Sequence, residues 1–487
     1  MDALSVRALE TAKLKGAEYA DVRVVHTADQ SLAVKNGVVE ALSSGESMGF
    51  GVRVLVDGAW GFASSRELTA DEVDKVADLA VKIARASALV RGDPVRLGPA
   101  VASRGAYTTP IQIDPFTISI EEKLNLLLRA DAAMARVKPA LSGDEGGIRV
   151  RRGHLTFIRE HKTFASSEGA DVEQTIYEAG GGLEATAVAG DEVQRRTYPG
   201  SRQQNTGGWE LVAALDLAGN AERTATEAVQ LLTADPCPGD QVTTLILGGE
   251  QLALQIHESC GHPIELDRVF GTEAAFAGTS FLTTDKLHNF QYGSEVVNIT
   301  AEAVRPTGLG TFGWDDEGVP AGSTPIVREG KFVGYLMSRE TASLFGLTSN
   351  GCMRASGWNR IPLIRMTNVS LEPGTWDFDD LIADTDDGIY METNRSWSID
   401  DKRYNFQFGT EIGYEIKKGK LGRRLRNCTY TGLTPEFWNA CDAICNEKHW
   451  TMWGTPNCGK GQPMQVAHTG HGAAPARFRN VKVGVLK

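Results

Sequence analysis

The chain has 487 residues, a formal net charge of −12 and a sequence pI of about 5.4. Its length predicts two or three domains, and its acidity argues against nucleic acid as a main partner because phosphate binding needs a basic surface. No apolar run approaches the roughly 18 residues of a membrane span, and the opening segment MDALSVRALETAKLKG lacks the apolar stretch of a signal peptide; we therefore expect a cytoplasmic protein with no membrane partner, whose seven cysteines are reduced or bind metal.

The first part of the chain, residues 1–95, combines helical and strand-like segments. Its expected elements are a helix at 3–15, a strand at 19–27, hairpin turns at Asn36-Gly37 and Asp57-Gly58, and a helix from Thr69 to about Ala88. Asn-Gly and Asp-Gly between alternating runs are typical of type I′ turns, which need positive φ at both central residues. Thr69 and Glu72 form the S/T-x-x-E pattern of a capping box at the start of the second helix.

A second part, residues 110–235, contains the same ingredients in another order. A connector at 91–115, with several Pro and Gly, joins it to the first part. Its expected elements are a helix begun by the capping box of Ser119 and Glu122, strand-like runs over 147–189, and a helical pattern from about Trp209 to Thr233. We therefore predict an N-terminal α+β domain with antiparallel sheets over residues 1–235.

The remaining residues, 236–487, form short alternating runs bounded by Gly, Pro, Asn and Asp, which is typical of β structure. Examples are PIVREGKFVGYLMS, FQFGTEIGYEIKKGK and RFRNVKVGVLK. One helix, from Gly249 to about Cys260, interrupts this pattern after the strand-like run VTTLILG. The predicted fold class is α+β, an N-terminal α/β region with antiparallel sheets followed by a β-rich C-terminal domain that carries this helix.

The segment HESCGHP, His257 to Pro263, resembles the zinc signature H-E-x-x-H with one additional residue. Two neutral imidazoles can bind a zinc ion and leave the glutamate to act as a base. An α-helix turns by about 100° per residue, so residues five apart lie about 140° apart and cannot share an ion on a regular helix. We therefore predict a π-bulge or a helix end between Glu258 and His262. Gly261, which tolerates irregular φ, and Pro263, which disfavours α geometry at His262, support such a break.

A catalytic zinc commonly has three protein ligands, and the residues themselves leave the third one open. Cys260 is adjacent in sequence, but placing it with both histidines would strain a short segment. The distant candidates are Cys458 in PNCGKGQP, His468 and His471 in AHTGHG, and Asp315 and Asp316 in WDDEG. Cys458 has the most favourable surroundings, because a Gly-rich turn lets a thiolate approach an ion closely.

Several separated motifs together resemble the TldD/PmbA family of metallopeptidases, also called modulators of DNA gyrase. They are AVKNGVVEALSS, HESCGHPIELDR, GWDDEGVPA, RASGWNRIPLIRMTN and PNCGKGQPMQVAHTGHGAAPARFRNVKVG, in this order along nearly the whole chain. The intact H-E-x-x-x-H places the chain on the TldD side of the family, because the PmbA (TldE) side lacks it.

The resemblance implies one Zn²⁺ per active subunit, bound by His257, His262 and Cys458, with Glu258 as the catalytic base. It also implies a dimer with a TldE/PmbA-type paralogue or with a second copy. The implied substrates are unfolded or short peptides, bound as an added β-strand.

Other residues are candidates for contact with the substrate. The oxyanion of peptide hydrolysis needs a donor besides the metal, and Arg395, Arg403, His468 and His471 are possible donors; Asp315 and Asp316 belong to a motif of the resemblance and are candidates for substrate binding. The predicted function is zinc-dependent peptide hydrolysis. The alternatives are a non-catalytic, peptide-binding assembly subunit and a zinc enzyme dedicated to the maturation of a modified peptide precursor.

Two further patterns have simpler interpretations. Cys441, Cys445 and His449 would form one stripe on a helix and could bind a second metal, but a half-buried helix face is the favoured interpretation. The basic run EIKKGKLGRRLR, 415–426, fits a solvated hairpin with its turn near Lys418-Gly419 better than a nucleic-acid surface.

Overall fold

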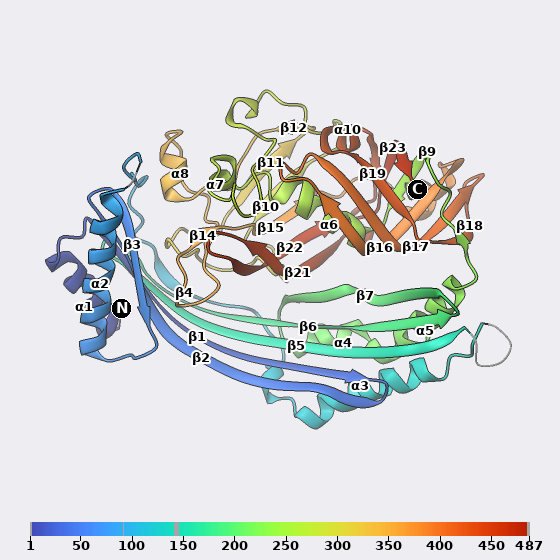
Figure 1. Cartoon of the computed structure of the whole chain (residues 1–487), viewed down its shortest axis with the longest axis horizontal. Helices are drawn as coiled ribbons and strands as arrows, with labels where there is room; N and C mark the ends of the chain where they lie inside the picture. Colours follow the sequence, from blue (N-terminus) through green and yellow to red (C-terminus); the bar gives the residue numbers. More distant parts are fainter. Residues whose placement is uncertain (1, 91, 141–145, 485–487) are drawn as a thin grey trace.

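The computed structural model describes residues 2–90, 92–140 and 146–484. A long curved sheet from the N-terminal half lies along one side of the molecule, and the β-rich C-terminal half lies over its concave side (Figure 1). This arrangement agrees with the predicted α+β class and with antiparallel sheets in the N-terminal region. Within the described residues, no helix is long and apolar enough to cross a membrane.

The N-terminal sheet has the order β3-β2-β1-β5-β6, with β4 and β7 both paired to β6. Its strands are β1 (Tyr19–Lys35), β2 (Val38–Val56), β3 (Ala59–Ser65), β4 (Arg104–Thr108), β5 (Gly147–Ser166), β6 (Asp171–Ala189) and β7 (Glu192–Thr206). All pairs are antiparallel except β4 with β6. The short strand β4 lies within the segment predicted as a plain connector. It could not be expected from its sequence, because RGAYT lacks an alternating apolar pattern.

The two predicted hairpin turns are confirmed by their backbone. Asn36 and Gly37 have φ of 49° and 78°, and Asp57 and Gly58 have φ of 51° and 69°. Positive φ at both central residues is what a type I′ turn requires, and Asn, Asp and Gly tolerate it with least strain. The Lys418-Gly419 turn, with φ of 51° and 69°, joins strands β17 (Asn405–Lys417) and β18 (Lys420–Arg426) in the same way.

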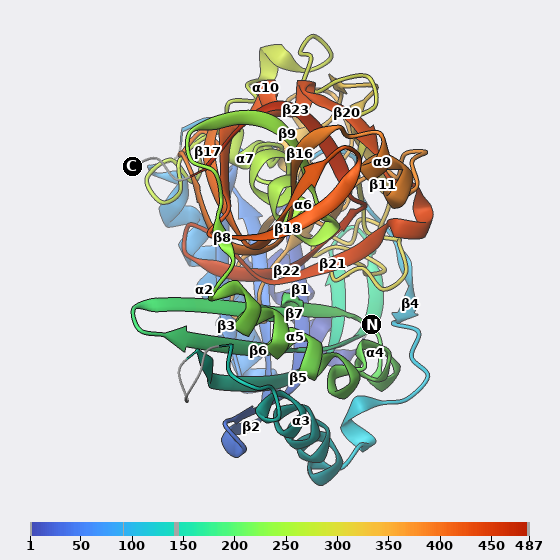
Figure 2. The ribbon, with the colours of Figure 1, turned by 90° about the vertical axis from the view of Figure 1, so that its right-hand side faces the viewer.

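Helices cover the outer face and one end of this sheet, as Figures 1 and 2 show. They are α1 (Ala3–Leu14), α2 (Ala70–Ala88), the 3-10 turn η1 (Pro115–Thr117), α3 (Ile120–Ala135), α4 (Trp209–Leu215) and α5 (Leu217–Leu231). The hydroxyls of Thr69 and Ser119 accept the predicted capping bonds from the backbone N–H groups of Glu72 and Glu122. The single helix expected from Trp209 is instead two helices, because Asp216 adopts a left-handed φ of 44° and caps α5.

The C-terminal half contains a closed barrel. Strands β16, β9, β23, β19 and β17 follow one another in the sheet, and an additional pairing of β16 with β17 closes the ring. The strands of this sheet are β8 (Asp235–Pro236), β9 (Gln241–Leu247), β16 (Asp387–Ile399), β17 (Asn405–Lys417), β18 (Lys420–Arg426), β19 (Thr429–Leu433), β20 (Cys441–Ile444) and β23 (Ala476–Val483). Residues 485–487, the end of the last predicted run, lie outside the described residues.

A second C-terminal sheet has the order β12-β11-β10-β15-β22-β21. Its strands are β10 (Ile299–Glu302), β11 (Ser323–Arg328), β12 (Lys331–Phe332), β15 (Asn368–Leu371), β21 (Thr451–Lys460) and β22 (Gln465–Ala473), with a separate hairpin of β13 (Met353–Arg354) and β14 (Leu363–Ile364). In both overall views β21 and β22 lie next to the N-terminal sheet, and the amide of Gln203 on β7 donates to the Met452 carbonyl on β21 at 2.9 Å. The remaining helices are α6 (Gly249–Ile256), the π-turn η2 (His257–Gly261), α7 (Leu266–Val269), η3 (Thr284–Lys286), α8 (Arg339–Ser343), α9 (Phe378–Ala383), α10 (Thr434–Asn439) and η4 (Glu447–His449).

The predicted helical stripe of Cys441, Cys445 and His449 is wrong. The helix in this segment, α10, ends at Asn439, and Cys441 begins strand β20, which pairs with β23. Both cysteines are buried, and His449 contacts Asp377 instead. The three side chains are not among the groups that could hold a metal in the described residues.

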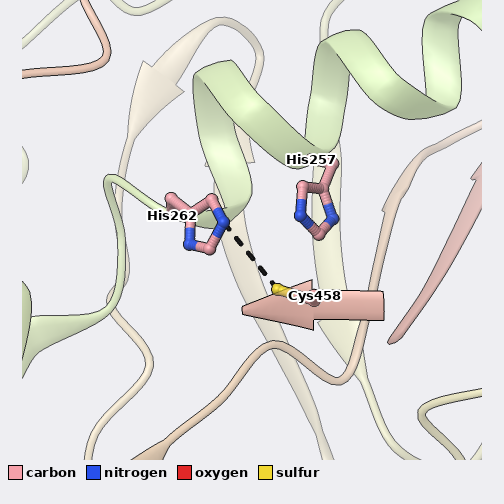
Figure 3. A group of neighbouring side chains, drawn as sticks. All are labelled: His257, His262 and Cys458. Atoms are coloured by element: carbon pink, nitrogen blue, oxygen red, sulfur yellow. Dashed lines mark hydrogen bonds between the residues drawn. The ribbon is translucent and has the colours of Figure 1, made fainter. Parts of the chain in front are cut away.

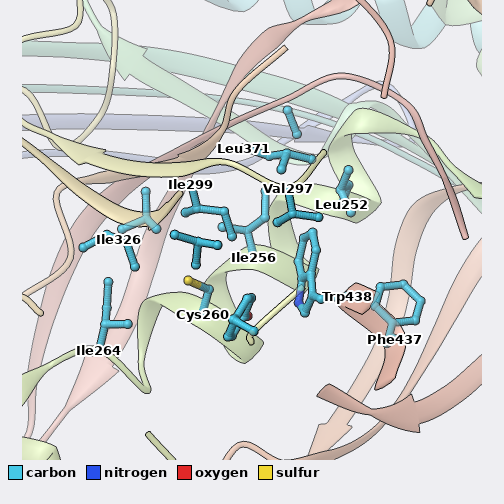
Figure 4. Packing of buried hydrophobic residues seen from close by; sticks show 14 of the residues in the cluster. Leu252, Ile256, Cys260, Ile264, Val297, Ile299, Ile326, Leu371, Phe437 and Trp438 are labelled. Atoms are coloured by element: carbon cyan, nitrogen blue, oxygen red, sulfur yellow. The ribbon is translucent and has the colours of Figure 1, made fainter. Parts of the chain in front are cut away.

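Helix α6 runs through the middle of the largest hydrophobic core. Leu252 and Ile256 of α6 and Cys260 of η2 lie among Ile299, Leu371 and Trp438, and all are fully buried (Figure 4). This packing fixes the helix from one side, so that its opposite side presents His257 and His262 to Cys458 on β21.

Candidate metal centre

The H-E-x-x-x-H segment leaves α geometry where the spacing requires it. Helix α6 continues into a π-turn from His257 to Gly261, and the backbone N–H of His262 donates to the carbonyl of His257 at 3.1 Å. This bond between residues five apart inserts one residue into the turn, which returns His262 to the side of His257. The two ring centres lie 4.9 Å apart. The predicted π-bulge is therefore confirmed.

Gly261 has a different role from the one expected. Its φ lies outside the left-handed region, so conformational freedom is not the reason for glycine. A Cβ at this position would overlap Sδ of Met366 and lie 3.2 Å from its Cγ. Because Met366 is fully buried, the missing side chain lets the π-turn pack directly on this methionine.

Cys458 joins the two histidines from a distant strand. One donor atom from each of His257, His262 and Cys458 lies within 4.8 Å of the other two, and all three residues are buried. Figure 3 shows the imidazoles descending from the helix toward Cys458 on β21, whose Sγ lies 3.8 Å from Nε2 of His262. Nitrogen and sulfur donors at such separations suit a tetrahedral metal of the zinc type. No other group of three or more such side chains is found in the described part of the chain.

A hydrogen-bond chain fixes the tautomer of His257. The Nδ1–H of His471 donates to the carbonyl of Val369 at 2.9 Å, so its Nε2 is an acceptor. This nitrogen lies 2.7 Å from Nδ1 of His257, which must therefore carry a proton and leave its Nε2 free to bind a metal. Burial lowers the pKa of both His257 and His471, which keeps both rings neutral.

Glu265 fixes the tautomer of His262. Its Oε2 accepts a hydrogen bond from Nδ1 of His262 at 2.9 Å, which leaves Nε2 of His262 directed at Cys458. Burial opposes the charge of Glu265, but Lys460, at 3.5 Å, and His262 hold its pKa far below the usual range. Glu265 was not among the candidate residues predicted from the sequence. Its position three residues after His262 was the available signal, because such a carboxylate often orients a metal-binding imidazole.

The surroundings of Cys458 favour a thiolate. Burial raises the pKa of its thiol, but His262 and the buried guanidinium of Arg365 outweigh burial and hold that pKa below its usual value. Arg365 also donates to the Cys458 carbonyl at 2.5 Å, which fixes the backbone of the strand. Cys260, in contrast, points into the hydrophobic core, where burial raises the pKa of its thiol to about 12.

Glu258 lies between the two histidines in sequence and is held by Arg403. Nη1 of Arg403 donates to its Oε2 at 2.6 Å. Burial raises the pKa of Glu258, but His257, His262 and Arg403 together lower it below the usual value, so that the group is a carboxylate. Nε of Arg403 is buried and makes no hydrogen bond to the described residues.

The other residues proposed from the sequence lie outside this cluster. His468 contacts Glu178 of the N-terminal sheet at 2.6 Å. Asp315 accepts backbone hydrogen bonds within its own turn and from Met353, while Asp316 pairs with Arg23 and Lys162. Arg395 is exposed and donates to Asn427 at 2.5 Å. Of the four proposed donors, the structure brings only Arg403 and His471 to the cluster.

Comparison with known proteins identifies relatives along nearly the whole chain. Three models of the PmbA/TldA metallopeptidases match: domain 1 over residues 20–84, the central domain over 113–232 and the C-terminal domain over 240–484. A metalloprotease of Methanocaldococcus jannaschii is 29% identical over 94% of this chain and 96% of its own length. A zinc metalloprotease TldD homolog of Saccharolobus solfataricus is 22% identical over 98% of both chains. The crystal structure of TldE from Thermococcus kodakarensis has the same fold, with a TM-score of 0.74 at 18% identity over 99% of this chain and 100% of that one.

Proposed function

The chain belongs to the PmbA/TldD family of metallopeptidases, and from that premise we propose that it is a zinc peptidase of the TldD type that hydrolyses unfolded or short peptides. The observation that carries the proposal is the cluster of His257, His262 and Cys458 with the carboxylate of Glu258 beside it. The PmbA-like alternative, a non-catalytic assembly subunit, has no need of this set of residues.

The donor set fits one zinc ion per subunit. Nε2 of His257, Nε2 of His262 and Sγ of Cys458 would hold it, because hydrogen bonds occupy the Nδ1 atoms of both rings. When bound, zinc supplies a Lewis acid that lowers the pKa of a coordinated water and polarises the peptide carbonyl. Three protein ligands leave a fourth position open for this chemistry.

We propose Glu258 as the general base. Its depressed pKa leaves it unprotonated at neutral pH, so its carboxylate can take a proton from the attacking water and pass it to the leaving amine. Arg403 occupies Oε2, which leaves Oε1 for proton transfer. The Nε–H of Arg403 is the most suitable oxyanion donor of those proposed, because His471 already uses both ring nitrogens. We propose that any contact of Arg395, His468, Asp315 and Asp316 with substrate lies away from the reacting atoms, because these residues pair outside the metal cluster.

The assembly and organisation of the protein are part of the same proposal. We propose a dimer with a TldE/PmbA-type subunit or with a second copy, and peptides bound as an added β-strand. We also propose a domain division near residues 235 and 236, which is supported by hydrophobic cores that lie wholly before or after it. A cytoplasmic location is supported by seven cysteines without a disulfide. Native mass measurement of the chain alone and with such a paralogue tests the dimer.

Two variants test the chemistry separately. Glu258→Gln should keep its zinc and lose nearly all metal-dependent hydrolysis of a peptide library, whereas Cys458→Ser should keep its fold and lose most of its zinc. Full activity in Glu258→Gln would exclude this residue as the base, and unchanged zinc in Cys458→Ser would exclude this ligand. Hydrolysis confined to one modified precursor would favour the maturation enzyme over a general peptidase.

A further inference from the structure

A cavity of about 290 Å³ lies between the N-terminal sheet and the C-terminal half. One wall consists of side chains from β5 and β6, including Glu160, Lys162 and Glu178, which alternate along their strands and therefore share a face. The other wall is formed by the loop of residues 309–314, by residues 354–356 and by residues 466–468 of β22. None of the residues of the metal centre lines it.

All but one of the charged side chains that line the cavity form ion pairs with other side chains. Lys162 contacts Asp316 at 2.8 Å and Glu160 at 3.6 Å, and His468 contacts Glu178 at 2.6 Å. Arg354 has no carboxylate within 4.0 Å of its nitrogens in the described residues, and its Nη2 donates to the carbonyl of Met366. The Nε atom of Arg354 is buried and has no hydrogen-bond partner in the part of the chain that the structure describes.

Arg354 is half-buried, so its guanidinium has lost part of its contact with water. A cation in such a position gains from a hydrogen-bonded anionic partner, which a ligand can supply. Burial, followed by the nearby Arg365, lowers the pKa of Arg354 to about 10, against the opposite effect of Cys458, Asp316 and Glu178. The guanidinium is therefore charged at neutral pH. The guanidinium is planar and its Nε–H has no partner among the described residues, and such a group matches the geometry of a carboxylate.

The walls around Arg354 suit the rest of an amino-acid residue. Its guanidinium lies 5.7 Å from the ring centre of Phe312, and Trp314, Ile158 and Ile176 also line the cavity. Gln174 fixes Trp314 by donating to its carbonyl at 3.0 Å. The cavity thus places apolar side chains and ion-paired polar ones around one cation that has no direct carboxylate contact among the described residues, which suits a pocket that orients a ligand through one charge.

The cavity and the metal centre lie on neighbouring strands, because β22 lines the cavity and pairs with β21, which carries Cys458. Ala467, which lines it, is the strand partner of Cys458, and Val466 is the partner of Gly459. A peptide that occupies the cavity therefore lies one strand away from the backbone that carries the thiolate.

We propose that this cavity is a subsite that binds a carboxylate-bearing residue of a peptide, with Arg354 as its counter-ion. The carboxylate comes either from an Asp or Glu side chain or from the C-terminus of the peptide. This inference rests on the proposed function, because it takes peptides as the ligands. It adds a charge preference that the metal centre alone does not provide.

Peptide binding to the Glu258→Gln variant tests the subsite without hydrolysis. The probes are four matched Ala-rich octapeptides, with either Glu or Gln at one inner position and with either a free or an amidated C-terminus, measured by calorimetry. A charge-assisted hydrogen bond contributes about 1.5–3 kcal/mol, so the preferred carboxylate should tighten binding by about 10-fold or more. A dependence on Glu identifies the side chain as the source, and a dependence on the free acid identifies the C-terminus.

A matched pair of arginine variants localises the effect. In the same background, Arg354→Gln should abolish the preference, and Arg104→Gln, at an exposed position on β4, should retain it. Equal binding of all four peptides, or a preference that survives Arg354→Gln, would overturn the inference. If Arg354→Gln does not fold, the four peptides still decide the question on the intact pocket. If the unmodified protein hydrolyses peptides without any charge preference, the subsite is refuted and the proposed function stands. If peptides bind in a charge-dependent way but are not hydrolysed, the subsite stands and the proposed function is refuted.

Discussion

Replacing Gly261 by alanine should disturb the π-turn that sets the spacing of the two histidines. The new Cβ would overlap Sδ of Met366 and lie 3.2 and 3.3 Å from its Cγ and Cε, so the methionine cannot escape by moving its end alone. Met366 is fully buried, and overpacking of this kind typically costs about 1–3 kcal/mol. The displaced turn carries His262, so zinc affinity should fall together with stability.

The assay combines urea unfolding with the zinc content of the purified variant. Gly322→Ala is the control, because nothing lies within 4 Å of a Cβ at that position and its φ is not left-handed; it should be neutral or more stable by up to about 1 kcal/mol. Met366→Ala makes room for the new methyl group, so Gly261→Ala combined with Met366→Ala should be less destabilised than the sum of the single variants. If Gly261→Ala matches Gly322→Ala in stability and zinc content, the close packing of the π-turn on Met366 is not what positions His262.

Three further predictions concern the site and its surroundings. Arg403→Met should lower kcat by about 100-fold, the scale of losing one oxyanion donor, with zinc retained; unchanged kcat at full zinc content would show that Arg403 does not act on the reaction. Glu178 raises the pKa of His468 despite burial. A histidine whose pKa is raised by folding stabilises the fold fully below its unfolded-state pKa of about 6.5, and this stabilisation is lost as pH rises through its folded-state pKa. The difference in unfolding free energy between wild type and Glu178→Gln should therefore be largest near pH 6 and shrink toward pH 9, and urea titrations that give a constant difference would refute this. At a free zinc concentration of 1,000 times Kd, bound zinc should stabilise the fold by about 4 kcal/mol, and a chelator should remove this contribution. Thermal unfolding before zinc removal, after it, and after zinc is returned measures the change.

The amino-acid sequence by itself determined the features that depend on neighbouring residues. Asn36-Gly37 and Asp57-Gly58 specify their turns because few other residue pairs adopt positive φ twice in succession. Thr69 and Ser119 begin helices because their hydroxyls satisfy N–H groups only three residues away. The π-turn belongs to the same class, since two histidines five residues apart cannot share one side of a regular helix.

Features that depend on distant segments were decided only by the tertiary structure. Cys441 and Cys445 had a helical spacing, yet pairing with β23 made the segment a strand, because tertiary contacts outweigh the small differences in local propensity. The sequence could offer Cys458 only as one candidate among several, because its distance to His262 depends on how β21 packs against the α6 region, 196 residues away in the chain. That Arg354 lacks a direct carboxylate contact among the described residues is likewise invisible in the sequence. Whether a charge has a partner is a property of the folded packing, and spacing along the chain does not encode it.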